Sequence, residues 1–164
     1  MPSTPPPAGP HPEAAEFRRA IRELTRLHQL RDRARVSAAG VTVAGGHALE
    51  VLAERGPVSL TALSAELFVD RSTACRIVGL LEDHGHVVRR ADPRDGRSIR
   101  VELTPEGRAL EAELRGGAVR ETAEALAGFD PGARSDALLF LRRLTRASAR
   151  HAGAVYREED DHEG

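Results

Sequence analysis

The chain has 164 residues, of which 40% are hydrophobic, and a formal net charge of −1. This length suits one domain with extensions, and no apolar run is long enough to cross a bilayer. Because Cys75 is the only cysteine, an internal disulfide and a cysteine cluster for a metal are excluded, so we expect a cytoplasmic protein.

The first twelve residues contain six prolines. They have neither the basic stretch nor the apolar core of a secretory signal, so we expect a disordered arm over residues 1–11. A helix is predicted from Pro12 to about Ala34, because apolar residues recur there at spacings of three and four. These residues are Phe17, Ile21, Leu24, Leu27 and Leu30.

A pair of short helices is predicted in the middle of the chain. Gly40 ends the first helix pattern, and Thr42 can cap a second helix that reaches Arg55. Val58 favours one short strand. Ser59 can then cap a helix that reaches Leu67, and Asp70 can cap the next one, from about Arg71 to His84. The buried stripes of these last two helices are expected to be Leu60, Leu63 and Leu67, and then Ala74, Ile77, Val78 and Leu81.

A basic hairpin is predicted next. The segments "HVVRRA" and "SIRVEL" have the composition of strands, and "DPRDGR" between them has the residues that turns need. Ile99, Val101 and Leu103 share one face of the second strand. From Arg71 to Arg100 there are seven arginines and four acidic residues, so this region is locally basic although the whole chain is not.

Two long helices are predicted at the end of the chain. Thr104 and Pro105 begin one that reaches about Ala127, and Asp130 and Pro131 begin one that reaches about Tyr156. The pair Gly116-Gly117 should cost the first of these about 2 kcal/mol relative to alanine, so we expect a kink or a break there. The last helix is expected to bury Leu138, Leu141 and Leu144, and residues 157–164 to form a disordered acidic tail.

Two helices joined by a tight turn and followed by a basic hairpin form a winged helix-turn-helix pattern. The helix "DRSTACRIVGLLEDHG" can lie in the major groove of double-stranded DNA, where arginine recognises guanine and hydroxyls reach bases or phosphates. The predicted contacts are Arg71, Ser72, Thr73 and Arg76. An ordinary capped surface helix is the alternative.

The hairpin tip can enter a flanking minor groove, whose negative potential attracts arginine. Arg97 is best placed for this, followed by Arg94. Arg89, Arg90 and Arg100 lie along the strands and can touch phosphates, while Asp92 and Asp95 are expected to hold guanidinium groups in position. The alternative is a solvated hairpin whose charges only keep a sheet edge soluble.

From about Val41 to Leu110 the chain resembles the MarR (multiple antibiotic resistance regulator) family of transcription factors. The resemblance is carried by "STACRIVGLLEDHGHVVRRADPRDGRSIRVELTPEGRAL". In that family a Ser-Thr pair begins the recognition helix, and an acidic, arginine-rich wing ends in a Leu-Thr helix start. Here the helix start is Ser72, Thr73 and Arg76, and the wing is Asp92, Arg94, Asp95, Arg97, Leu103 and Thr104.

The resemblance implies a mainly α protein with a small β-wing, in which residues 12–156 form one domain. The winged helix-turn-helix covers about residues 41–104, and the helices over about 12–36 and 105–156 form a dimerisation layer. It also implies a homodimer that binds a pseudo-palindromic operator, usually as a repressor that a small-molecule ligand releases. Two residues depart from the family pattern: Phe68 stands where the turn often has Gly, and Ser64 where Ala is common. A bulky residue with positive φ is strained, so either the turn differs or Phe68 packs between helices.

Other residues suggest alternatives to this function. Cys75 lies on the proposed recognition helix, so its oxidation could switch DNA binding, or it could be a small filler residue. His28 and His47, together with His151, could meet in a ligand or metal site, although ordinary polar or interface histidines are the favoured explanation. No catalytic motif is present, so we expect no enzyme, no cofactor and no metal. A redox- or metal-responsive regulator and a protein-interaction module remain the alternative functions.

Overall fold

The computed structural model describes residues 13–92 and 95–160, and for residues 95–97 and 150–160 it gives the backbone only. The chain divides into two compact units, Met1–Ala118 (unit 1) and Val119–Gly164 (unit 2). Each unit is described by itself.

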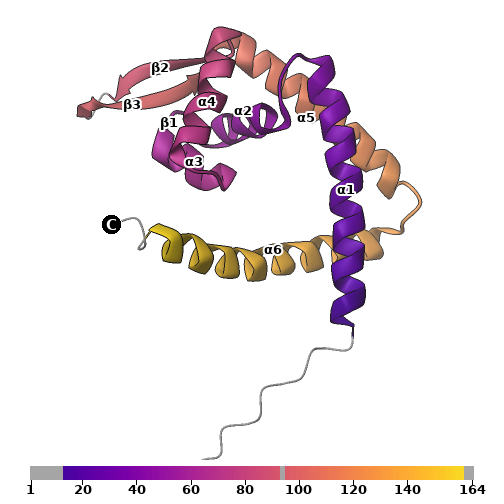
Figure 1. Cartoon of the computed structure of the whole chain (residues 1–164). Helices are drawn as coiled ribbons and strands as arrows, with labels where there is room; N and C mark the ends of the chain where they lie inside the picture. Colours follow the sequence, from indigo (N-terminus) through magenta and orange to yellow (C-terminus); the bar gives the residue numbers. More distant parts are fainter. Residues whose placement is uncertain (1–12, 93–94, 161–164) are drawn as a thin grey trace, which may run out of the picture. The chain divides into compact units, whose positions relative to one another are not determined.

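Unit 1 contains a helix-turn-helix and a small sheet (Figure 1). The sheet is antiparallel, with strand order β1-β3-β2, and Val101 pairs with both Val58 and Arg89. The prediction of a mainly α winged helix is thus confirmed. The elements of this unit are α1 (Ala14–Ala38), α2 (Val43–Arg55), β1 (Val58–Ser59), α3 (Leu60–Leu67), α4 (Arg71–Asp83), β2 (Val87–Asp92), β3 (Asp95–Leu103) and the first part of α5 (Pro105–Leu126).

The helix starts lie where the capping residues predict them. Thr42 Oγ1 accepts a hydrogen bond from the Gly45 amide at 3.0 Å, and Ser59 Oγ accepts one from the Ala62 amide at 3.1 Å. Each of these bonds satisfies one of the amides that a helix leaves unpaired at its first turn. Thr104 and Asp130 cap α5 and α6 (Pro131–Asp160) in the same way.

The core of unit 1 joins the helix-turn-helix to the sheet. Leu49 and Leu52 of α2, Leu63 of α3 and Val78 of α4 meet Val101 of β3, and all five are fully buried. The predicted stripe of α4 is buried throughout, and Leu103 is buried beside Val101. Ile99 is exposed, because it lies further out along the hairpin, beyond the helices that cover Val101.

Phe68 occupies the turn between α3 and α4 in the left-handed conformation, with φ 53° and ψ 47°. Its amide donates to the Ala65 carbonyl, and the Val69 amide donates to the Ser64 carbonyl, so the turn satisfies the last carbonyls of α3. Both alternatives raised by the sequence are wrong: the turn keeps its left-handed geometry, and Phe68 is 59% exposed rather than packed between helices. The conformation costs about 1–2 kcal/mol in a residue with a Cβ.

Of the two outcomes predicted for Gly116-Gly117, a kink or a break, the break is wrong. α5 continues through both glycines, because glycine weakens a helix without removing a backbone hydrogen bond. In unit 2, Leu138 and Leu141 of α6 are about half exposed, and Leu144 is only partly buried. The apolar residues of α1 from Phe17 to Leu30 are also exposed, because no other element of the described single chain buries them.

No single described helix has both the length and the hydropathy that a membrane span requires. α1 and α2 meet the requirement only when taken together, and they are bent by 86° where they join.

Gly107 fixes the start of α5 against the end of α4. A Cβ built on Gly107 would lie 1.9 Å from the carbonyl oxygen of His86, which accepts a hydrogen bond from the Thr104 amide. We therefore expect Gly107→Ala to lower the free energy of unfolding by about 1–3 kcal/mol, since backbone must move to admit the methyl group. Chemical denaturation of the purified protein measures this.

Gly79→Ala is the matched control, because a Cβ on Gly79 of α4 would have no atom within 4 Å. Alanine there should stabilise the helix by up to about 1 kcal/mol. If both variants changed stability equally, the close approach of Gly107 to His86 would not matter for folding.

Candidate nucleic-acid interface

The first turn of α4 is organised around the carboxylate of Asp70. Asp70 Oδ1 accepts from the Thr73 amide at 2.7 Å and from Ser72 Oγ at 2.5 Å. Asp70 Oδ2 accepts from Thr73 Oγ1 at 2.6 Å. The hydrogen bonds from the Ser72 and Thr73 hydroxyls, with those from the backbone amides, hold the pKa of Asp70 well below its usual range. Asp70 is therefore ionised at neutral pH.

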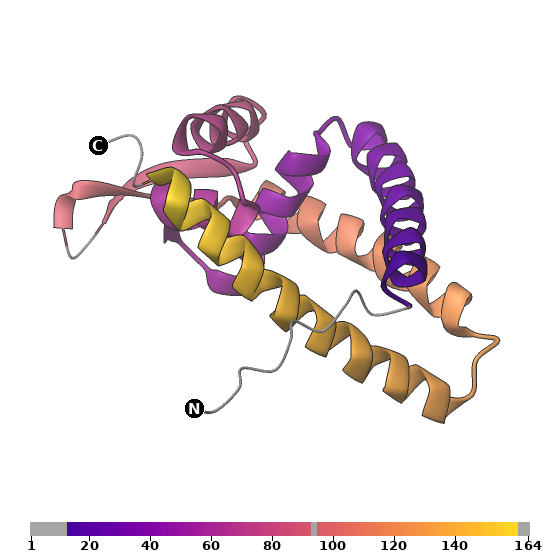
Figure 2. The same ribbon diagram turned by 60° about the horizontal axis from the view of Figure 1, so that its bottom comes forward.

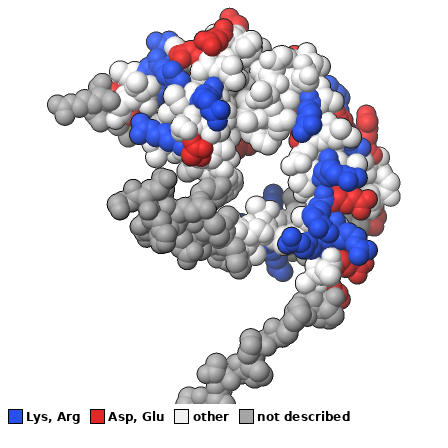
Figure 3. All heavy atoms as spheres, in the orientation of Figure 1, with Lys and Arg blue, Asp and Glu red and all other residues white. Residues whose placement is uncertain are grey.

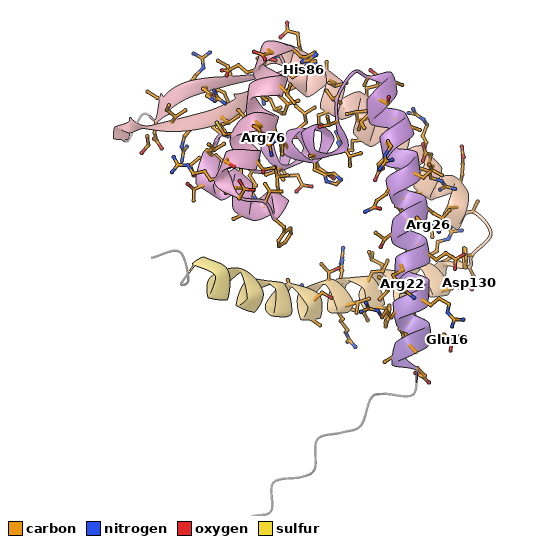
Figure 4. The ribbon with its side chains drawn as sticks, in the orientation of Figure 1. Glu16, Arg22, Arg26, Arg76, His86 and Asp130 are labelled. Carbon is orange, nitrogen blue, oxygen red and sulfur yellow. The ribbon has the colours of Figure 1, made fainter. Side chains whose placement is uncertain are left out.

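Two arginines project from the outer face of α4. Arg76 (labelled in Figure 4) donates from Nη2 to Thr73 Oγ1 at 3.1 Å, which leaves most of its guanidinium protons available. Arg71 at the first helical position is exposed and makes no ion pair within the described part of the chain. With Leu60, Ser72 and Cys75, they line an open hollow of about 610 Å³. Four of the five residues of this hollow belong to α4.

The β2–β3 hairpin projects from unit 1, with α4 beside its base (Figures 1 and 2). Arg89 of β2 ties the two together: Arg89 Nη1 lies 3.1 Å from Glu82 Oε2, and Arg89 Nη2 donates to the Cys75 carbonyl at 3.3 Å. The Arg89 amide also donates to Glu82 Oε1 at 3.3 Å. Arg89 thus joins the hairpin to α4, a role that its position on a strand did not predict.

The other strand arginines also have carboxylate partners. Arg90 pairs with Glu102 across the hairpin, and Arg100 Nε lies 2.7 Å from Asp92 Oδ2. Asp92 therefore holds a guanidinium, as the sequence predicted. Figure 3 shows blue basic side chains over α4 and the hairpin, with red acidic side chains next to several of them. Since each pair is partly neutralised, these strand positions offer less net charge than the count of arginines suggests.

The predicted wing tip lies outside the residues that the structure describes. Pro93 and Arg94 fall in the gap between residues 92 and 95. Asp95, Gly96 and Arg97 belong to β3, but their side chains are not described. The predicted roles of Arg94, Arg97 and Asp95 therefore stay predictions.

The structure does not bring the candidate histidines and Cys75 into a common hollow among those described. His28 and His47 are both exposed and do not line either hollow named here, while the side chain of His151 is not described. Within the described residues, no group of three or more His, Cys, Asp or Glu side chains could hold a metal. Cys75 is exposed in the hollow on α4, with Sγ 3.9 Å from Arg89 Nη2.

A second hollow, which no sequence motif indicated, lies in unit 1 between α2, β3 and the start of α5. Its volume is about 460 Å³, and Glu111 at its wall is only 7% exposed. Arg115 Nε lies 2.9 Å from Glu111 Oε1. The remaining lining residues are Ala53, Glu54, Leu103, Arg108 and Ala112.

Helices α2 to α4, the three-stranded sheet and the projecting hairpin form a winged helix-turn-helix, a class of transcriptional regulator domain. A protein-family model described as the MarR family matches residues 39–98. The chain belongs to the MarR family of transcriptional regulators, as the wing and recognition-helix motifs indicated.

Comparison with individual proteins agrees with this assignment. The putative transcriptional regulatory protein for the hcr operon of Thauera aromatica is 31% identical over 107 residues, which are 65% of this chain and 64% of that protein. The match therefore spans less than two thirds of that relative's length. A probable transcriptional regulator from Pseudomonas aeruginosa, known as a crystal structure, is 31% identical, with a TM-score of 0.59 over 76% of this chain and 96% of that one.

Two further solved structures share the fold. A MarR family protein from Bacillus stearothermophilus has a TM-score of 0.78 at 23% identity, over 87% of this chain and 99% of that one. BpsR of Bordetella bronchiseptica, whose DNA binding is regulated by 6-hydroxynicotinic acid, is 25% identical, with a TM-score of 0.68 over 84% of this chain and 98% of that one. These relatives are regulators rather than enzymes, in line with the absence of catalytic motifs from the sequence.

Proposed function

We propose that the protein is a cytoplasmic, sequence-specific regulator that binds double-stranded DNA with α4 in the major groove and the hairpin toward a flanking minor groove. The observation that carries this proposal is the outer face of α4, where Arg71, Ser72 and Arg76 are exposed together beside the hairpin. Within the described residues neither arginine has a carboxylate partner, so both guanidinium groups can contact DNA. Arginine donors match the guanine acceptors of the major groove.

We propose further that the protein acts as a homodimer on a pseudo-palindromic operator. In unit 1, the apolar residues of α1 from Phe17 to Leu30 are 42% to 66% exposed, and in unit 2 four consecutive residues of α6, from Leu138 to Leu141, are about half exposed. Helices that leave such stripes uncovered in one chain are typical of proteins that bury them against a second copy. The proposed dimerisation helices cover about residues 12–36 and 105–156, and a two-fold axis would repeat α4 for two half-sites.

Selection of bound DNA from a random pool with the purified protein tests both parts of the proposal. We expect a pseudo-palindromic motif, with half-sites about one helical turn apart. Retention should weaken steeply as salt rises, because phosphate contacts release counterions. A protein that enriched no motif and bound no DNA would instead be a protein-interaction module. A motif without two-fold symmetry would contradict the homodimer alone.

We propose that the protein represses its target and that a small molecule releases it. The support is the relative BpsR, which a small aromatic acid regulates. The second hollow in unit 1, with Arg108 and Arg115 at its wall, is a better candidate place for an effector than the exposed His28 and His47. Loss of operator binding on addition of small aromatic acids tests this part.

A redox-responsive regulator is the second candidate function, favoured by the exposure of Cys75 on the proposed DNA-facing side of α4. Hydrogen peroxide would oxidise the thiol to a sulfenic acid, with water as the reduced product. If this is a switch, peroxide should lower operator affinity, thiol should restore it, and Cys75→Ser should be insensitive. Equal affinity of oxidised and reduced protein, measured by gel shift, would leave Cys75 as a small filler residue.

A further inference from the structure

We infer that Ser72 selects bases carrying an exocyclic amino group, cytosine N4 or adenine N6, by accepting a hydrogen bond from that group. The inference deepens the proposed function, because it assumes that α4 lies in the major groove. It concerns what one hydroxyl can and cannot contact there. The starting observation is the direction of the hydrogen bonds around Asp70.

The hydroxyl proton of Ser72 is already committed. An ionised carboxylate only accepts hydrogen bonds, so the bond of 2.5 Å between Ser72 Oγ and Asp70 Oδ1 must use the serine proton. The same reasoning applies to Thr73 Oγ1 and Asp70 Oδ2 at 2.6 Å. Ser72 Oγ therefore presents only lone pairs to any further partner.

Ser72 is the better placed of the two hydroxyls. Thr73 is half-buried, and its oxygen also accepts from Arg76 Nη2 at 3.1 Å. Ser72 is exposed and lines the hollow of about 610 Å³ on the outer face of α4. A DNA base that enters this hollow meets the Ser72 oxygen as an acceptor.

Phosphate is the wrong partner for this hydroxyl. Phosphate oxygens are acceptors and carry negative charge, while Ser72 Oγ has no proton left to donate and the Asp70 carboxylate lies beside it. The amide of Thr73 also donates to Asp70, so this amide of the helix N-terminus is not available to bind a phosphate. A major-groove donor fits instead, and the only donors there are cytosine N4 and adenine N6.

Arg71 and Arg76 supply hydrogen-bond donors beside the Ser72 acceptor. Their guanidinium groups only donate, so they fit guanine O6 and N7. Ser72 and Arg76 are four residues apart, which places them on the same face of α4. The hollow thus offers donors beside one acceptor, which is the complement of a G·C pair seen from the major groove or of a guanine next to an adenine.

The test uses full-length protein and the operator obtained by selection. Each cytosine and adenine of one half-site is replaced in turn by 2-pyrimidinone or purine, the same bases without the amino group. For wild-type protein, one replacement should weaken binding roughly 10-fold, the value of one lost hydrogen bond. Ser72→Ala should bind the intact operator and the operator replaced at that position with equal affinity.

Ser37→Ala is the matched control, because Ser37 is exposed near the end of α1, outside α4 and outside the proposed dimerisation residues. This variant should keep the wild-type penalty. The inference is overturned if no replacement has a penalty that depends on Ser72. It is also overturned if the difference in affinity between wild type and Ser72→Ala disappears when a backbone phosphate is replaced by a neutral methylphosphonate, but persists when the amino group is removed. If wild-type protein selects no motif at all, the proposed function fails first, and the two failures are thereby distinguished.

Discussion

Arg76→Ala should strongly weaken specific operator binding while leaving the protein folded. A bidentate arginine–guanine contact contributes about 1–3 kcal/mol of discrimination. A homodimer loses two such contacts, so the affinity for the selected operator should fall at least about 30-fold. Affinity for unrelated DNA should fall much less, because only one charge per subunit is removed. Fluorescence anisotropy with the selected operator and with a scrambled duplex measures both.

The structure explains why this variant should fold normally. Arg76 is exposed, and within the described residues its guanidinium donates to Thr73 Oγ1, which keeps its own bond to Asp70. The packing of α4 depends on the opposite face, where Ala74 and Val78 are fully buried. The melting temperature of Arg76→Ala should therefore stay within about 2 °C of the wild type.

Arg142→Ala is the control for charge, since Arg142 is an exposed arginine of α6. It removes one positive charge per subunit without touching α4. If Arg142→Ala and Arg76→Ala weakened operator binding equally, the loss would come from net charge and not from base recognition. Specificity would then have to lie elsewhere than in α4.

Local chemistry made much of the site predictable. The caps Thr42, Ser59 and Asp70 are visible in the sequence, because a capping side chain acts within three residues of itself. The buried stripe of α4 follows from helical periodicity in the same way. Together they fix which face of α4 points outward, and so they predict that Arg71, Ser72 and Arg76 are exposed.

Contacts between elements were not predictable. Arg89 lies on the basic hairpin in the sequence, but its pairing with Glu82 depends on how β2 packs beside α4. The unbroken passage of α5 through Gly116-Gly117 and the left-handed Phe68 show that a local penalty of about 1–2 kcal/mol does not by itself decide the conformation. The apolar stripes of α1 and α6 were predicted to be buried helix faces. They are exposed in the single chain, which is the surface that the proposed second copy would cover.

The double variant Leu24→Gln/Leu27→Gln should convert the proposed dimer into a monomer. Both side chains lie on the apolar stripe of α1 and are about half exposed in one chain, so a second copy can bury what remains. Burying a leucine contributes about 1.5–3 kcal/mol, and half of that for two leucines in each of two subunits amounts to about 3–6 kcal/mol. The dimer dissociation constant should therefore rise at least about 100-fold. Sedimentation equilibrium over a range of concentrations measures it.

Arg22→Gln/Arg26→Gln is the matched control on the same helix: both arginines, labelled in Figure 4, are exposed, and helical periodicity places them off the stripe. Glutamine forms helix about as well as leucine and arginine, so neither double variant should unfold α1 by propensity alone. The control should stay dimeric, whereas the stripe variant should sediment as a monomer and bind the operator only as strongly as one half-site allows. A stripe variant that remained dimeric would show that α1 does not form the subunit interface, and the exposed residues of α6 would become the candidate surface.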